Sequence, residues 1–375
     1  MEMKEPTVAG METIRTPALV IDMDAVGDNI SATLRLLGGK PDRWRPHLKT
    51  AKLALVMRAM VEWGVRQAKC STTLELETAC EAGFLDLLLA YPVTAPQADV
   101  VRRIAAKHPD VSVSVLVEDR KMLEHWRGST VGIFIDLNSG MDRTGMLLDG
   151  YMDILDLARA ITGAGLRYAG LHFYDGHASA FSADDAERRV HAGYDRLHDL
   201  VERLKTDGVV TPEVITAGTP AFPHALGYSR FAAAGVIHRN SPGTVVYNDC
   251  KSLSQLPAGA GYRPAALVLT TVVSQPGPAR ICSDAGHKSV SADAGIPTCA
   301  VLGHPELLPR HPSEEHLPMD VTGGVRVPSR GDKLWLLPAH VCPTVNNFDH
   351  AVIVKNGAVQ GLERVTARGR HAPID

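Results

Sequence analysis

The chain has 375 residues, of which 45% are hydrophobic and 22% charged, so it can bury a sizeable core, and this composition argues against bulk disorder. The formal net charge of -3 gives no overall field for nucleic acid or an anionic membrane. The six cysteines form no close CxxC pair, no apolar run is long enough to span a bilayer, and residues 1–10 lack the apolar core of a signal peptide. We therefore expect a cytoplasmic protein.

Strands and helices alternate through the first two-thirds of the chain. A strand at 16–23 precedes a helix at 24–37, for which Asp24 is the expected N-cap. A second helix is expected at 53–60. Later strands are predicted at 67–71, 86–90, 111–115, 132–136, 167–173, 213–217 and 236–239, and later helices at 73–82, 95–107, 120–125, 150–164 and 184–207.

With a short strand before Lys49, this alternation gives about eight β-α units and predicts a closed (β/α)8 barrel over residues 24–255. A doubly wound open sheet is the alternative, but residues 21–29 lack its GxGxxG fingerprint. A mostly β second domain is predicted from residues 1–23 and 256–375. Its β-rich runs, punctuated by Gly and Pro, lie at 265–274, 279–284, 298–303, 333–337 and 351–355.

Residues 45–52 (RPHLKTAK) carry the first candidate for chemistry. Lys49 ends a short strand, stands two residues from His47 and is followed by an apolar helix. A lysine amine that desolvation keeps neutral is suited to forming a Schiff base. The alternative is a basic surface loop, because lysine clusters are common on solvated faces.

Further candidates follow other predicted strands, at the end where such barrels place their active sites. Arg143 lies in the segment 136–145, and Tyr174, a candidate for cofactor binding, begins the run YDGH that ends at His177. Two turns after the last strands can cradle a phosphate with backbone N–H groups, although such turns are usually only turns. Their candidate residues are Gly218, Thr219, Gly243 and Thr244. With Lys49 and Arg143, they describe a site for pyridoxal 5′-phosphate (PLP).

His340 and Cys342, in the run PAHVCPTVN, are the candidate metal ligands. We expect this run to be extended, so that residues two apart face the same side and converge on one ion. Imidazole with thiolate suits zinc better than magnesium or calcium. Glu315 and His316 are candidate outer partners. The alternative is a buried cysteine and a histidine bonded to backbone.

On the runs RPHLKTAK, 136–145, YDGH, PGTVVYND, DAGHKS and PAHVCPTVN, the chain resembles the D-threonine aldolase and D-serine dehydratase family. This family belongs to the alanine-racemase-like, fold type III group of PLP enzymes. The resemblance implies a PLP-binding TIM-type barrel, a β domain built from both chain ends, and a homodimer whose partner helps close each site. It implies that Lys49 carries PLP and that His340 and Cys342 bind a divalent metal. Zinc is favoured, with manganese or magnesium as alternatives.

Two departures bear on the reaction. Alanine racemases place an arginine before the Pro-Gly pair that matches residues 242–243, where it contacts the pyridine nitrogen, whereas this chain has Ser241. We therefore do not predict racemase chemistry. The His-x-Cys metal motif resembles eukaryotic zinc D-serine dehydratases, whereas bacterial D-threonine aldolases often have His-x-Asp. The run YDGH instead resembles the aldolase side.

The favoured reaction is dehydration of a D-β-hydroxy amino acid, such as D-serine, D-threonine or 3-hydroxyaspartate, to a keto acid and ammonia. The alternative is retro-aldol cleavage, as in a D-threonine aldolase. In both, the metal activates the β-hydroxyl, and His47 and His177 are candidate bases unless their rings only pack or orient the cofactor. A racemase and a non-catalytic PLP-binding barrel are the other hypotheses. The first needs a catalytic tyrosine and the β domain offers little beyond Tyr262, while the second would not carry a β domain.

Overall fold

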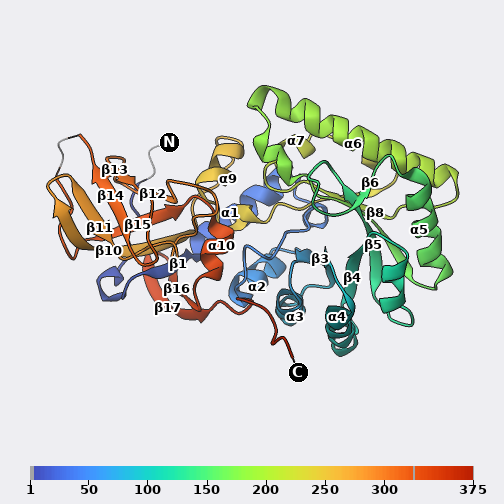
Figure 1. Ribbon diagram of the computed structural model, residues 1–375, viewed down its shortest axis with the longest axis horizontal. Helices are drawn as coiled ribbons and strands as arrows, with labels where there is room; N and C mark the ends of the chain where they lie inside the picture. The colour runs from blue at the N-terminus through green and yellow to red at the C-terminus, as the bar shows by residue number, and fades with distance from the viewer. Residues whose placement is uncertain (1–3, 324–325, 375) are drawn as a thin grey trace.

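The computed structural model describes residues 4–323 and 326–374, and the chain folds into two lobes, each built on one sheet (Figure 1). One lobe contains a parallel sheet with helices, and the other is mostly β. The limits of the two predicted domains stay a prediction, and residues 1–3, 324–325 and 375 of the predicted β domain lie outside the described residues.

The strands of the first lobe run parallel, in the order in which they follow one another along the chain. They are β2 (Gln67–Cys70), β3 (Asp86–Pro92), β4 (Ser112–Val117), β5 (Gly132–Asn138), β7 (Arg167–Phe173), β8 (Glu213–Thr216) and β9 (Ile237–Asn240), with the short β6 (Met146–Leu147) beside β5. The barrel is closed by the segment 44–47, in which Trp44 pairs with Asn240 of β9 and His47 pairs with Lys69 of β2. This confirms the predicted (β/α)8 barrel.

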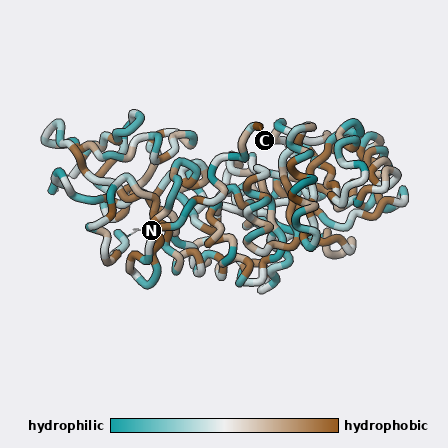
Figure 2. Tube along the Cα trace, turned by 90° about the horizontal axis from the view of Figure 1, so that it is seen from below, coloured by the Kyte–Doolittle hydropathy of each residue, from teal (hydrophilic) through white to brown (hydrophobic). Residues whose placement is uncertain are grey.

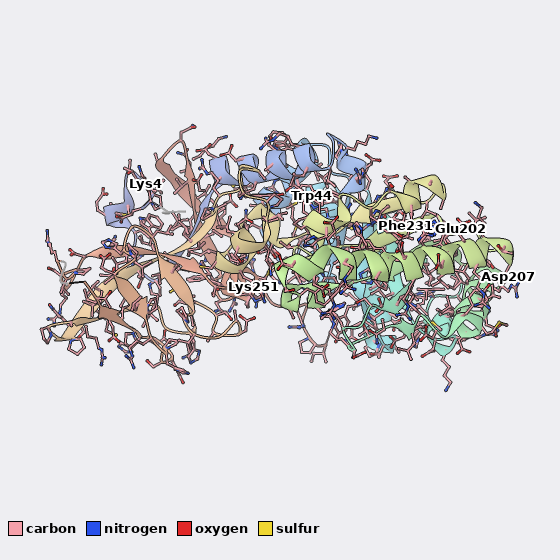
Figure 3. The ribbon with its side chains drawn as sticks, turned by 90° about the horizontal axis from the view of Figure 1, so that it is seen from above. Lys4, Trp44, Glu202, Asp207, Phe231 and Lys251 are labelled. Atoms are coloured by element: carbon pink, nitrogen blue, oxygen red, sulfur yellow. The ribbon has the colours of Figure 1, made fainter. Side chains whose placement is uncertain are left out.

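Helices cover the outside of the barrel, and the longest, α6, ends near Glu202 and Asp207 (Figure 3). The α-helices of this lobe and its edge are α1 (Met23–Leu36), α2 (Ala54–Glu62), α3 (Thr73–Ala82), α4 (Ala95–Lys107), α5 (Tyr151–Gly163), α6 (Ala183–Thr206), α7 (Phe222–Ala225), α8 (Arg230–Ala233) and α9 (Cys250–Gln255). Single 3-10 turns lie at η2 (Pro41–Arg43), η3 (Lys121–His125), η4 (Gly176–Ala180) and η5 (Thr244–Val246).

The second lobe is built around β10 and takes its strands from both ends of the chain. They are β1 (Ala18–Asp22), β10 (Ala266–Gly277), β11 (Arg280–Ser283), β12 (Cys299–Val301), β13 (Leu307–Pro309), β14 (Leu317–Val321), β15 (Lys333–Pro338), β16 (His350–Lys355) and β17 (Ala358–Arg364); η1 (Met11–Thr13) and α10 (Val341–Asn346) complete it. β1 lies between β10 and β16, so the first strand of the chain is central in this sheet (Figure 1). Hydrophilic residues concentrate on the outer turns of both lobes (Figure 2).

The barrel interior is layered, because residues two apart on a strand face the same side. Near the beginning of the strands, four charged side chains form ion pairs: Arg45, Asp86, Glu213 and Arg239. An apolar layer follows, made of Leu88, Leu116, Phe134, Ala169 and Ile215. Beyond it, Asp136 and His172 make the interior polar again at the carboxyl ends of the strands, where the site lies.

Three local predictions are wrong. Helix α1 is capped by Asp22, whose side chain accepts hydrogen bonds from the N–H groups of Asp24 and Ala25, because β1 runs directly into the helix. The segment predicted as a helix at 120–125 forms only a 3-10 turn. His340 is extended, but Cys342 lies in the first turn of α10, so the metal motif spans a strand–helix boundary and is not one extended run.

Candidate active site

A cavity of about 310 Å³ lies where the carboxyl ends of the barrel strands face the β lobe. It brings together nine of the predicted site residues: His47, Lys49, Tyr174, Gly218, Thr219, Gly243, Thr244, His340 and Cys342. Lys251, on α9, lies at its edge where the two lobes meet (Figure 3). A cavity of this size is typical of a small-molecule site, and its mostly polar lining suits a polar, charged ligand.

The ring of Tyr174, which lines the cavity, is the common neighbour of two cationic side chains. Lys49 Nζ lies 5.9 Å from the ring centroid and Arg143 Cζ lies 5.2 Å from it. Glycines flank the ring, since a Cβ at Gly176 or Gly218 would come within 2.6 or 2.8 Å of its atoms. The two turns therefore fix the position of Tyr174 by close backbone approach, which only glycine permits there.

His47 is held in its neutral form. Burial, followed by the charges of Lys49 and Lys69, sets the pKa of His47 well below the ordinary histidine value. Its Nδ1 lies 3.4 Å from the backbone N of Lys49. A neutral imidazole on the wall of the cavity can accept a proton, so the geometry allows the predicted role of base without testing it.

The phosphate turns differ from the prediction in one detail. The N–H of Gly218 donates to Asp175 Oδ1 at 2.9 Å, so this amide has a protein acceptor already. Gly243 is held against His47, because a Cβ there would meet the carbonyl oxygen of His47 at 2.5 Å. Thr219 and Thr244 line the cavity beside these glycines.

Ser241 supplies an observation that bears on PLP. Its hydroxyl is buried, lines the cavity and has no hydrogen-bond partner among the described residues. A buried polar atom without a hydrogen-bond partner costs free energy, so we expect a ligand or a water molecule to bind it. The hydroxyl, the amine of Lys49 and the two Thr-bearing turns together fit a cofactor that carries a polar ring, an aldehyde and a phosphate.

The metal motif forms a chain of three side chains at the other wall of the cavity. Asp293 Oδ2 lies 2.6 Å from His340 Nδ1, and His340 in turn interacts with Cys342. Burial opposes the charge on His340, but its hydrogen bonds to Cys342 and Asp293 raise its pKa to about 9. Burial acts against the Cys342 thiolate, yet His340 lowers the pKa of Cys342 below its ordinary value.

This arrangement fits a divalent ion with two protein ligands. A carboxylate on Nδ1 leaves Nε2 of His340 for a metal, which is the usual arrangement of a carboxylate–histidine–metal site. Among residues 4–323 and 326–374, no group of three or more His, Cys, Asp or Glu side chains is placed to hold an ion. The expected outer partners Glu315 and His316 do not line the cavity, and Glu315 pairs with Lys288 at 3.2 Å, so their assignment stays a prediction.

Two further predicted residues do not line the cavity. Arg143 is exposed, and its Cζ lies 5.2 Å from the ring centroid of Tyr174. His177 lies in η4, packs edge-to-face on Phe181 at 5.2 Å and leaves its Nδ1 buried without a partner among the described residues. Their assignments stay predictions.

Comparison with known proteins agrees with this geometry. Residues 21–247, which include the whole barrel up to η5, match the family model of the alanine racemase N-terminal domain. The chain belongs to this family. Residues 265–354 match a second model, described as a putative serine dehydratase domain.

Relatives that match this chain over nearly their whole length are named as aldolases or dehydratases. A D-threonine aldolase from an Arthrobacter species is 26% identical over 95% of this chain and 93% of its own, and a 3-hydroxy-D-aspartate aldolase from Paracoccus denitrificans is 27% identical over 97% and 95%. The crystal structure of D-threonine aldolase from Filomicrobium marinum superposes with a TM-score of 0.87 at 26% identity and covers 97% of this chain and 98% of that one. A D-threo-3-hydroxyaspartate dehydratase variant described as a metal-free form shares the fold, with a TM-score of 0.82, 23% identity and coverage of 96% and 99%.

Sequence reasoning missed Asp293, Lys69 and His172. Asp293 reaches His340 only through the fold of the β lobe, 47 residues away, and no local pattern marks it. Burial and register, which the sequence does not show, reveal the other two. Lys69 is a charged residue in a strand that is buried throughout, and His172 stands in register with Asp136 on the neighbouring strand.

Proposed function

We propose that this protein is a PLP- and divalent-metal-dependent lyase that acts on D-β-hydroxy amino acids. One observation carries the proposal: a single cavity has the amine of Lys49 on its barrel wall and the Asp293–His340–Cys342 chain on its β-lobe wall. A substrate held between them presents Cα to one wall and its β-hydroxyl to the other. The names of the family members support the D-β-hydroxy substrate class.

The residues on the barrel wall would act at the α-carbon of the substrate. PLP, when bound, supplies an electron sink for the charge that forms at Cα. Lys49 would hold the cofactor and then take the proton from Cα at Nζ, with Ser241 and the Thr219 and Thr244 turns fixing the ring and the phosphate. Neutral His47 adds no positive charge to this wall at neutral pH.

The residues on the β-lobe wall would act at the β-hydroxyl of the substrate. A divalent ion on His340 and Cys342 would supply a Lewis acid, and the thiolate favours zinc. Asp293 orients the imidazole of His340, and the hydroxyl of Thr50, 3.1 Å from Cys342 Sγ, does the same for the thiolate.

We favour dehydration over retro-aldol cleavage. Cleavage of Cα–Cβ needs a base at the β-hydroxyl. Of the two candidates, His177 does not line the cavity, and His47 lies on the barrel wall with Lys49 and not on the wall of the metal motif. Dehydration needs only a base at Cα, which Lys49 would be, and Lewis-acid help for loss of the hydroxyl, which an ion held by His340 and Cys342 would supply. Aldol cleavage is the second candidate, because two family members are named aldolases and His177 Nδ1 is buried without a partner among the described residues.

Product analysis tests the proposal. The loaded protein is expected to convert D-serine, D-threonine or 3-hydroxy-D-aspartate to a keto acid and ammonia, and a chelator is expected to abolish turnover while the visible absorption of bound PLP persists. Added zinc should restore turnover. Cys342→Ala should be inactive at the same PLP loading, whereas Cys282→Ala, a half-buried cysteine on β11, should behave as wild type.

Three outcomes would change the proposal. Full activity in metal-free protein or in Cys342→Ala would show that turnover needs no metal at this site. Glycine with an aldehyde, and no keto acid from any of the three substrates, would replace dehydration by aldol cleavage. The absence of any turnover of these substrates by protein loaded with PLP and zinc would refute the lyase.

A further inference from the structure

Lys69 is a second lysine beside the candidate site, and the proposed function does not use it. It stands on β2, is 1% exposed and does not line the cavity. Its amine reaches up past the apolar layer of the barrel to His172 Nε2, at 3.2 Å. The same amine lies 5.3 Å from the centroid of Tyr174, the ring that Lys49 and Arg143 also approach.

The contact continues through two further strands. His172 Nδ1 on β7 lies 2.7 Å from Asp136 Oδ1 on β5, and Asp136 Oδ2 accepts a hydrogen bond from the hydroxyl of Thr144 at 2.8 Å. Thr144 adjoins Arg143. We call Lys69, His172 and Asp136 the Lys69 triad; it runs from the barrel interior to the loop that carries Arg143.

The groups around Lys69 shift its pKa in opposite directions. Burial, and then the charge of Lys49, lower the pKa of Lys69 to about 7, while Asp175 and Asp136 act in the opposite direction. Charged or titratable groups face Lys69 from three parts of the barrel. They are Arg45, His47 and Lys49 before α2; Asp136 on β5 and Arg143 in the loop after it; and His172, Tyr174 and Asp175 on or after β7.

The other members of the triad are suited to exchange a proton with Lys69. Burial and then Lys69 lower the pKa of His172, so its imidazole is neutral and its Nε2 can accept. Burial opposes ionisation of Asp136, but the hydrogen bond from His172 keeps the pKa of Asp136 below its ordinary value. Ionised Asp136 fixes the His172 proton on Nδ1, which directs the lone pair of Nε2 at Lys69.

We propose that the Lys69 triad stores one proton beneath Tyr174, and that Lys69 is a positioning residue that sets the charge felt by Lys49 and Arg143. When the N–H bond breaks at Lys69 Nζ, a new one forms at His172 Nε2, and Asp136 stays ionised throughout. The stored positive charge thus moves between amine and imidazole without leaving the barrel. The effect on Lys49 rests on the proposed function, whereas proton storage does not.

The first test uses the full chain without cofactor. Lysines labelled with ¹³C at Cε are titrated by NMR, and one resonance should change with a midpoint near pH 7 and be missing from Lys69→Met. In Asp136→Asn that midpoint should fall by about one pH unit, because an opposite charge is removed. If every lysine titrates near the ordinary value of about 10.4, the triad stores no proton.

The second test uses the PLP-loaded protein and the pH midpoint of its visible absorption. Removing a nearby positive charge makes protonation of the Lys49 nitrogen easier, so Lys69→Met should shift the midpoint upward by about one pH unit. Lys52→Met is the matched control: Lys52 is also buried, but it is paired with Glu75 at 2.9 Å and with the carbonyl of Ala367 at 3.0 Å. It should titrate as wild type.

The results separate the two proposals. A midpoint near pH 7 in the free protein, with no lyase activity, would leave the triad standing and refute the proposed function. Equal absorption midpoints in wild type and Lys69→Met would overturn the positioning role. If Lys69→Met does not fold, Lys69→Gln tests the same role, because it also removes the positive charge and should shift the absorption midpoint upward; an unchanged midpoint would overturn the role.

Discussion

The barrel interior holds two groups of charged side chains, one at each end of the strands, and they differ in how their charges are balanced. At the beginning of the strands, Arg45 and Arg239 face Asp86 and Glu213, two cations against two anions. At the carboxyl end, Lys49, Lys69 and Arg143 surround the ring of Tyr174. Asp136 and Asp175 are the anions there, and each is bound to other groups.

The most buried cation of each group is equally deep, so burial alone does not explain the difference between these two side chains. Arg45 is 0% exposed and Lys69 1%. Arg45 Nε donates to Glu213 at 2.9 Å, whereas the amine of Lys69 has an imidazole as its nearest partner, at 3.2 Å. An arginine stays charged in any case, and its carboxylate partners let it stabilise the structure, while a buried lysine beside neutral groups becomes titratable. The apolar layer of the barrel lies between the two charged groups and separates them.

The largest expected effect comes from breaking the matched group. Glu213→Gln keeps the shape but leaves two arginines with Asp86 alone, and an unpaired buried charge costs about 3–5 kcal/mol. Urea unfolding at pH 7 should show a loss of that order. Glu124→Gln, which removes an exposed partner of Arg127, is the control and should leave the unfolding midpoint unchanged. Equal midpoints for the two variants would mean that the matched group does not stabilise the barrel.

A smaller effect is expected from the unmatched group, and it depends on pH. The pKa of Lys69 is about 7 in the folded chain, against an ordinary value of about 10.4 when unfolded, so the unfolded chain binds more protons between these values. The free energy of unfolding then rises with pH in this window, by up to about 1.4 kcal/mol per pH unit from this one group.

Lys69→Met should remove that contribution. Its unfolding free energy, measured in urea from about pH 7 to pH 10 without cofactor, should rise less steeply than that of wild type. Other groups, such as His340, contribute equally to both proteins and cancel in the difference. Parallel curves would contradict a depressed Lys69 pKa, and with it the comparison between the two ends of the barrel.

The sequence predicted the barrel because its signal is local. Apolar runs alternate with helix-length segments, and the residues at the ends of those runs, such as Lys49 and Thr219, had to meet at one rim once the sheet was parallel. The same reasoning suggested that the first strand belongs to the β domain, since the barrel needed no extra strand; its pairing with β10 and β16 is seen only in the structure. Family motifs then placed His340 and Cys342 at the same site.

The parts that could not be predicted depend on contacts between distant segments. Asp293 was missed because its loop meets His340 only after the β lobe folds. The wrong assumption of an extended His340–Cys342 run came from two-residue periodicity, which α10 interrupts. The Lys69 triad joins three strands, and its chemistry arises from their register.

Lys49 is the residue on which the proposed function depends most, and a borohydride trap tests directly whether it holds the cofactor. PLP-loaded protein is reduced, digested and analysed by mass spectrometry in wild type and in Lys49→Ala. The predicted result is a pyridoxyl group on the Lys49 peptide of wild type and on no peptide of the variant. A pyridoxyl group on Lys69, Lys52 or Lys288 in wild type would contradict it.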